Sequence, residues 1–227
     1  MSNKPSILTL ALPFLLLAAS VAGCVQQQVS ATGAKGSALH GWPAAAAAAE
    51  KWQRNATLIL LGGVETERPL ELLRGGPDWG IDLLHQPDSN LADGLAPAWL
   101  YTFEGHNATL YVVVDAGGNV TSSELPASAR LNPEWWPFAA AGDRPLRQPL
   151  MDSNEIASIL AAQDATWKKL QGKTGTQVFF TLSASPQPYW IVGAVNKNLR
   201  LRSVNALDAV SGKILDPSRF PQLQGGP

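Results

Sequence analysis

The chain has 227 residues, with 17 Lys and Arg against 18 Asp and Glu, so its formal net charge is −1. This balance argues against a nucleic-acid-binding protein, which needs a basic surface to displace counterions from phosphates. Charged residues make up 15% and hydrophobic residues 45% of the chain, which excludes wholesale disorder, and a single Cys excludes an intrachain disulfide and a cysteine-based zinc site.

The N-terminus has the pattern of a secretory signal. A short polar start containing Lys4 precedes an apolar run over 7–19. A membrane-spanning helix needs roughly 20 residues, so this run is too short to cross a bilayer but suits a signal core. The small residues Ala22 and Gly23 come directly before the only cysteine, Cys24. We therefore expect a signal peptide over 1–23.

The stretch 21–24 resembles the lipobox of prokaryotic lipoproteins, in which the signal is cut before a cysteine that then carries lipid. Val21 stands where the family more often has Leu. The alternative is that Cys24 is a small buried core residue. The resemblance implies a membrane anchor on Cys24 and an extracytoplasmic location. Residues 24–41, rich in Gln, Ser, Gly and Ala, are then expected to form a flexible tether.

The remainder reads as two similar units, a first over 42–125 with an insertion near 65–96 and a second over 151–216. Segment 55–58 can be aligned with 164–167, and the Asp-Ala-Gly-Gly-Asn turn at 115–119 with the Asp-Ala-Val-Ser-Gly-Lys turn at 208–213. Segment 126–150 forms a Pro- and Trp-rich linker between them, and 217–227 a C-terminal tail.

Each unit is expected to begin with a helix. In the first, Trp42-Pro43 followed by six alanines starts the helix and Gly62-Gly63 ends it. In the second, Asp152 and Glu155 form a capping box, and an apolar stripe that includes Trp167 continues to Gly172.

Strands are predicted after each helix. Their ranges are 99–103, 110–115 and a return strand from 120 in the first unit, and 177–182, 189–195, 199–207 and 214–215 in the second. The predicted fold class is α+β, with two tandem units in which a helix packs on an antiparallel β-meander.

Both units resemble PepSY-type domains, small extracytoplasmic modules with one helix on an antiparallel sheet. The resemblance rests on the amphipathic helix and on the hairpins at 115–120 and 208–214. It implies a non-catalytic binding or regulatory module, one that restrains a peptidase or another envelope partner, with no cofactor.

Sites for chemistry are sparse. The three histidines His40, His85 and His106 lack a Gly-x-Ser-x-Gly elbow and lack the paired spacing of helical zinc ligands, so we expect neither an enzyme nor a zinc centre. Asp78, Asp82 and His85 lie in the acidic stretch 75–94, which leaves a small-ligand or metal-binding lipoprotein as the alternative function.

Trp135 and Trp136 form the apolar centre of the linker. If exposed, they are candidate partner-binding residues, since Trp is enriched at interface hot spots. If buried, they fix the linker against both units.

Overall fold

The computed structural model describes residues 34–64, 91–126, 150–170, 176–183, 187–196 and 201–216. The elements in chain order are α1 (Trp42–Trp52), β1 (Thr57–Val64), β2 (Ala98–Glu104), β3 (Ala108–Asp115), β4 (Val120–Pro126), α4 (Ser153–Gln163), α5 (Ala165–Leu170), β5 (Thr176–Ser183), β6 (Tyr189–Asn196), β7 (Leu201–Asp208) and β8 (Ile214–Leu215). The α+β class is therefore confirmed, and the predicted strands lie within one or two residues of those observed.

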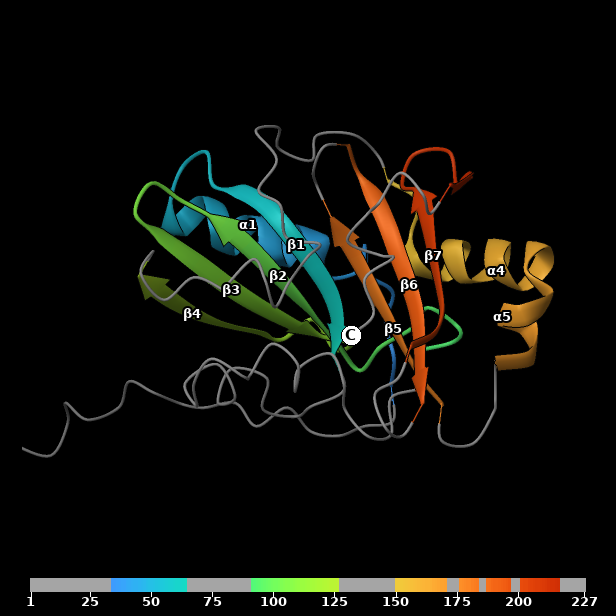
Figure 1. Cartoon of the computed structure of the whole chain (residues 1–227). Helices are drawn as coiled ribbons and strands as arrows, with labels where there is room; N and C mark the ends of the chain where they lie inside the picture. Colours follow the sequence, from blue (N-terminus) through green and yellow to red (C-terminus); the bar gives the residue numbers. More distant parts are fainter. Residues whose placement is uncertain are drawn as a thin grey trace, which may run out of the picture.

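The eight strands that the structure describes belong to one antiparallel sheet, in the order β4-β3-β2-β1-β5-β6-β7-β8 (Figure 1). The centre of the sheet is the β1–β5 pair, in which Leu60 lies opposite Ser183 and Gly62 opposite Thr181. Strands from the first and second predicted units thus share a continuous hydrogen-bonded ladder.

The helices pack against one face of this sheet. Figure 1 shows α1 behind β1–β3, and α4 and α5 beside β5–β7. A single apolar cluster joins the helices to both halves of the sheet, and its largest fully buried members include Trp99, Trp167, Trp190, Tyr101 and Phe180. None of the helices in the described ranges is long and apolar enough to span a bilayer.

The first helix is shorter than predicted. It ends at Trp52, and the backbone then turns through Asn55, which adopts a left-handed conformation with φ of 71°. The next residues form β1, so Gly62 and Gly63 lie inside a strand rather than at the end of a helix. The run of Thr and branched aliphatic residues from Thr57 suits a strand buried on both faces, and this burial outweighs the helical propensity of its leucines.

The second helix is interrupted. The capping box of Asp152 and Glu155 is confirmed, but α4 ends at Gln163 because Asp164 takes an extended conformation. The Asp164 carboxylate accepts hydrogen bonds from the N–H groups of Thr166 (2.8 Å) and Trp167 (3.1 Å), which starts α5. Trp167 still points at the sheet, where its ring meets Phe180 edge-on at 6.3 Å.

The alignment of segment 55–58 with 164–167 is wrong. Thr57 and Leu58 lie in β1, whereas Thr166 and Trp167 lie in α5. The part of the predicted tether that the structure describes also differs from expectation, because Ala38 is fully buried and Gly36 pairs with Ala96. Residues 36–41 are therefore a packed part of the fold.

Candidate functional site at the junction of the sheet halves

The segment that precedes α1 is held against the sheet by backbone groups. Gly36 and Ala96 exchange two backbone hydrogen bonds of 2.8 and 3.0 Å. Trp99 donates its indole N–H to the carbonyl of Gly36 (2.8 Å), and the Tyr101 hydroxyl donates to the carbonyl of Ala38 (2.5 Å). This segment and its contacts with the start of α4 form what we call the junction, comprising residues 36–39, 94, 99, 152–153 and 190.

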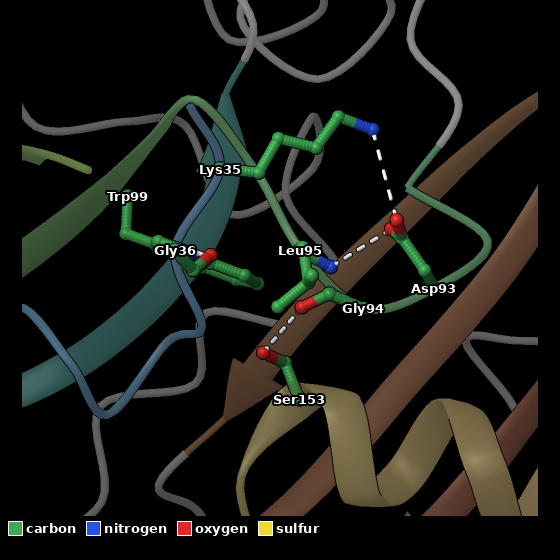
Figure 2. Close-up of polar contacts among 7 residues, drawn as sticks. All are labelled: Lys35, Gly36, Asp93, Gly94, Leu95, Trp99 and Ser153. Carbon is green, nitrogen blue, oxygen red and sulfur yellow. Dashed lines mark hydrogen bonds and ion pairs between the residues drawn. The ribbon is translucent and has the colours of Figure 1, made fainter. Parts of the chain in front are cut away.

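The start of α4 holds the same segment from the other side. The Ser153 hydroxyl accepts a hydrogen bond from the N–H of Ala38 (2.9 Å) and donates one to the carbonyl of Gly94 (2.6 Å), as Figure 2 shows for Gly94. Asp152 accepts from the N–H of Leu39 (2.9 Å) as well as from Ser153 within its own cap (2.7 Å). The helix cap of the second half therefore also fixes two chain segments of the first half.

Gly94 is required at this contact. Its φ is +73°, a conformation that residues with a side chain rarely adopt, and an added Cβ would lie 2.2 Å from the carbonyl oxygen of Ser153. The backbone of residue 94 can approach α4 this closely only because it carries no side chain.

The rim of the junction carries the only charged pair drawn in Figure 2. Lys35 lies 3.9 Å from Asp93, whose carboxylate also accepts the N–H of Leu95 at 3.1 Å. Their side chains are 36% and 53% exposed, so the ion pair contributes little to stability.

Two tryptophans fill the interior of the junction. Trp99 and Trp190 pack edge to face with ring centroids 6.3 Å apart, and Phe180 packs against Trp190 at the same distance. The indole N–H of Trp190 donates to the carbonyl of Met151 (3.0 Å), just as that of Trp99 donates to Gly36. The polar groups of both rings are thus used in structural hydrogen bonds.

Burial, together with the nearby Asp152 charge, raises the pKa of Tyr101 far above its usual range. The Tyr101 hydroxyl consequently stays protonated and keeps donating to Ala38. We infer that the hydroxyl has a structural role, which is to hold the backbone at Ala38 against the sheet. A general base would instead need a pKa near the working pH.

The two aligned turns lie at the same place in each half. Asp115 ends β3 and accepts from the N–H of Asn119 (2.8 Å), and Asp208 ends β7 and accepts from the N–H of Ser211 (2.7 Å). Burial acts to raise the pKa of Asp208, but hydrogen bonds from Ser211 and from the N–H of Val210 outweigh it and lower that pKa. Both carboxylates therefore stabilise the turns in which they lie by accepting backbone hydrogen bonds.

The histidines within the described residues are exposed and separate. His40 lies in the turn before α1, and His106 in the turn between β2 and β3. In the ranges that the structure describes, no three His, Cys, Asp or Glu side chains gather as a metal site would require. The other candidates lie outside the described residues: Cys24, Asp78, Asp82, His85, Trp135 and Trp136.

Sequence reasoning missed the junction itself. Its hydrogen bonds join residues 113 and 115 positions apart, and such pairs leave no local pattern. The capping box at Asp152 was the one signal available, and it marked the helix start without indicating that Asp152 and Ser153 also hold the segment before α1.

No protein-family model matches the chain, and no curated protein matches it. Among solved structures, the chain is similar to one from Clostridium difficile 630, described as a "putative lipoprotein". The two are 11% identical, the match covers 77% of this chain and 90% of the other, and the TM-score is 0.41. A likeness at this level carries no argument about function.

Proposed function

We propose that the chain is a non-catalytic, lipid-anchored protein of the cell envelope that binds another envelope protein. The observation that supports a binding role most is the packed junction. The interior of the junction is filled by Trp99 and Trp190, and the indole N–H groups of both rings donate to backbone carbonyls. A small-ligand protein would be expected to have a concave site with a few free polar groups at such a meeting point.

The anchor is assigned to Cys24 on its sequence context. It follows the apolar core 7–19 and the small pair Ala22-Gly23, and it is the only cysteine. Acyl chains gain roughly 0.8 kcal/mol per buried methylene, so two or more chains hold a protein firmly on a membrane.

The anchor is tested by fractionation of cells that express the parent or Cys24→Ala. The parent should sediment with membranes and the variant should become soluble, with equal thermal melting of the two purified proteins showing that the fold is intact. Equal sedimentation of both proteins would contradict the lipid anchor.

Partner binding is assigned to the linker aromatics Trp135 and Trp136. A pull-down from intact envelopes with the parent should capture a protein that the double variant Trp135→Ala/Trp136→Ala captures at least ten-fold less well, with both baits showing the same melting temperature. Capture of nothing, together with a small molecule or metal retained by the purified protein in native mass spectrometry, would favour the alternative of a ligand-binding lipoprotein.

The resemblance to PepSY-type domains adds a finer proposal, that the partner is a peptidase which the protein restrains. It is tested by adding the purified protein to solubilised envelope and measuring peptidase activity, which should fall. Unchanged activity at saturating protein would contradict restraint and leave a binding role without inhibition.

We also propose that the two halves arose by duplication. Read outward from the centre of the sheet, the strands follow the order β1 to β4 on one side and β5 to β8 on the other. Matching contacts recur in each half: Ala116 donates its N–H to the carbonyl of Pro97 (2.9 Å), and Ala209 donates to Pro188 (3.1 Å). These pairs support an equivalence based on the strands and turns.

The pairing at the sheet centre is consistent with that equivalence. Gly63 is paired with Trp99, and Leu182 is paired with Trp190, so Gly63 and Leu182 hold matching places. The residues that precede them, Gly62 and Thr181, lie opposite each other in the β1–β5 pair. Gly62 and Thr181 therefore hold matching places in the two halves and also pair with each other. Two copies related by a local two-fold axis must meet in this way, with each position opposite its equivalent at the axis.

A further inference from the structure

Basic residues are unevenly distributed along the chain. Between Asp164 and Asp208 there are six Lys or Arg residues and no Asp or Glu. The six are Lys168, Lys169, Lys173, Lys197, Arg200 and Arg202. The rest of the chain carries the other 11 of the 17 basic residues and all 18 acidic ones. The net charge of −1 therefore conceals one strongly positive segment within the second half.

The topology brings these six residues to one end of the second half. Thr176 at the start of β5 is paired with Asn196 at the end of β6, and β7 begins opposite Val195. Figure 1 shows α5 running beside these strands toward the same end. The connections 171–175 and 197–200 join the elements there, and they contain the remaining three basic residues: Lys173, Lys197 and Arg200. We call the six residues the basic end.

The described members of the basic end are accessible and unneutralised. Lys168 and Lys169 lie in the last turn of α5, and Arg202 lies on β7. All three residues are exposed. Neither of the two ion pairs found among the described residues involves any of them. Their charges are therefore available to an anionic partner.

The acidic residues of the second half lie mainly at its other end. Asp152 and Glu155 cap the start of α4, and Asp208 is the last residue of β7. The N–H of Met151 donates to the carbonyl of Ala209 (2.7 Å), so the start of α4 lies beside the end of β7. The second half thus carries opposite charge at its two ends, and an anionic surface is attracted to one of them and repelled by the other.

The segment that leads back to Cys24 joins the sheet at the side of the basic end. Because β1 and β5 are antiparallel, Val64 at the end of β1 lies toward the start of β5. Ala98 is paired with Val64, and Gly36 is bridged to Ala96 just beyond that pair. Neighbouring strands lie about 4.8 Å apart, so Gly36 lies roughly 10–20 Å across the sheet from the strands of the basic end. The chain from the proposed anchor therefore enters the fold on the positively charged side.

A membrane that contains anionic lipids attracts such a surface. Each Lys or Arg near an anionic headgroup layer strengthens binding by a factor of roughly five, and the attraction weakens beyond a Debye length of about 10 Å at 0.1 M salt. A lipid anchor keeps the fold close to the headgroups, so that modest attraction is enough to orient it. The position beside the anchored segment favours lipid headgroups over a soluble polyanion.

We propose that the basic end binds anionic lipid headgroups, so that the anchored protein stands with this end against the membrane. This inference rests on the proposed lipid anchor and names the surface and the lipid class that meet. The acidic start of α4 then points away from the bilayer. The basic end orients the protein and does not replace the anchor, because binding by surface charge alone is reversible.

The test measures binding of the mature chain 24–227, carrying Cys24→Ala, to lipid vesicles that are then sedimented. Without lipid on residue 24, only the protein itself meets the membrane. Vesicles with one third phosphatidylglycerol in phosphatidylcholine should bind the protein at least ten-fold more tightly than vesicles of phosphatidylcholine alone. Raising the salt concentration from roughly 0.05 M to 0.5 M should abolish the difference. Equal binding to both kinds of vesicle at low salt would overturn the proposal.

Two matched variants locate the surface. The basic-end variant is Lys168→Gln/Lys169→Gln/Arg202→Gln. The control variant removes three exposed charges from the other end of the sheet: Lys51→Gln/Arg54→Gln/Lys213→Gln. The basic-end variant should bind phosphatidylglycerol vesicles at least ten-fold more weakly than the parent, and the control within about two-fold, with the same melting temperature for all three proteins. Equal losses in both variants would overturn the basic end, because attraction would then follow net charge alone.

Other anionic partners give different results. Inorganic phosphate should displace the protein from vesicles no better than chloride does at the same ionic strength. Stronger displacement by phosphate would overturn lipid binding in favour of a free phosphate site. If anionic vesicles fail to bind the parent while the basic-end variant loses a partner that the parent captures from envelopes, the basic end binds an acidic protein and the proposal is wrong.

The outcome can be separated from the lipid anchor. If Cys24→Ala releases the protein from cell membranes while phosphatidylglycerol vesicles fail to bind it, the role of the basic end is wrong and the anchor stands. If the vesicles bind the protein but its N-terminal peptide carries no lipid, the role of the basic end stands and the anchor is wrong.

Discussion

Ser153→Ala removes the side chain that joins α4 to two segments of the first half. The hydroxyl is fully buried, accepts the N–H of Ala38 and donates to the carbonyl of Gly94. Without it, both backbone groups are left buried without their partner, and each such group costs about 1–3 kcal/mol. Since the two losses share one site and do not simply add, we expect the free energy of unfolding to fall by about 2–4 kcal/mol.

The matched control is Ser158→Ala on the same helix. The Ser158 hydroxyl is exposed and bonds only to the carbonyl of Asn154 one turn earlier (2.8 Å). This change should stay within about 0.5 kcal/mol, as for most surface substitutions. In a protein of this size 1 kcal/mol shifts the melting temperature by about 2–4 °C, so Ser153→Ala should melt roughly 4–16 °C below the parent.

The assay is thermal and urea unfolding of both variants, followed by far-UV circular dichroism and by tryptophan fluorescence. The two probes should give coincident single transitions, because the halves share one sheet and one apolar cluster. Equal, small shifts for Ser153→Ala and Ser158→Ala would refute the structural role assigned to the Ser153 hydroxyl. Two separate transitions would refute the common core.

Gly94→Ala should destabilise the protein far more than Gly118→Ala. Both glycines have positive φ, but only at Gly94 do backbone atoms lie within 3 Å of the added Cβ. The difference in urea unfolding between the two variants therefore measures the effect of that contact. Trp167→Ala should cost about 3–5 kcal/mol because the ring is fully buried, whereas Lys168→Ala on the exposed side of α5 should shift the melting temperature little. The lowered pKa of Asp208 means that its carboxylate stabilises the fold above the unfolded pKa of 3.8, and that this contribution is lost as the pH falls through the lower folded value. The difference in melting temperature between the parent and Asp208→Asn should therefore be largest near neutral pH and shrink below about pH 4, and a difference that stays constant down to pH 2 would contradict the shift.

The sheet strands were predictable where their side-chain pattern was strong. Aromatic and β-branched residues mark β2, β3 and β6, and the turns at Asp115 and Asp208 mark the hairpins that follow β3 and β7. These signals depend only on residues close together in the chain, so they can be recognised in a single sequence. The helix start at Asp152 was predictable for the same reason.

The boundary between α1 and β1 was not predictable from the same signals. An alanine-rich segment runs into an apolar one without Pro or Gly between them, and the chain leaves the helix through an extended Gln53 and a left-handed Asn55. Asn tolerates that conformation, so its presence was a weak signal. Gly62 and Gly63 looked like a helix end because their place in a buried strand depends on tertiary neighbours, such as Leu91 beside Gly63.

The pairing of the two halves into one sheet could not be predicted from the local hydrophobic pattern of the strands. The β1–β5 pair connects residues more than one hundred positions apart. Both strands are buried on each face, so neither shows the apolar and polar alternation that marks a strand with one solvated face. Local reasoning therefore yields two separate meanders, and only the register of Leu60, Leu61 and Gly62 with β5 shows one sheet.

The central claim is that the protein is anchored to a membrane by lipid on Cys24, and mass spectrometry of the N-terminal peptide of the protein purified from membranes tests it most directly. We expect a chain that begins at Cys24 and carries a mass increase equal to two or three acyl chains. A chain that retains residues 1–23, or one that begins at or beyond Cys24 without lipid, would contradict the account.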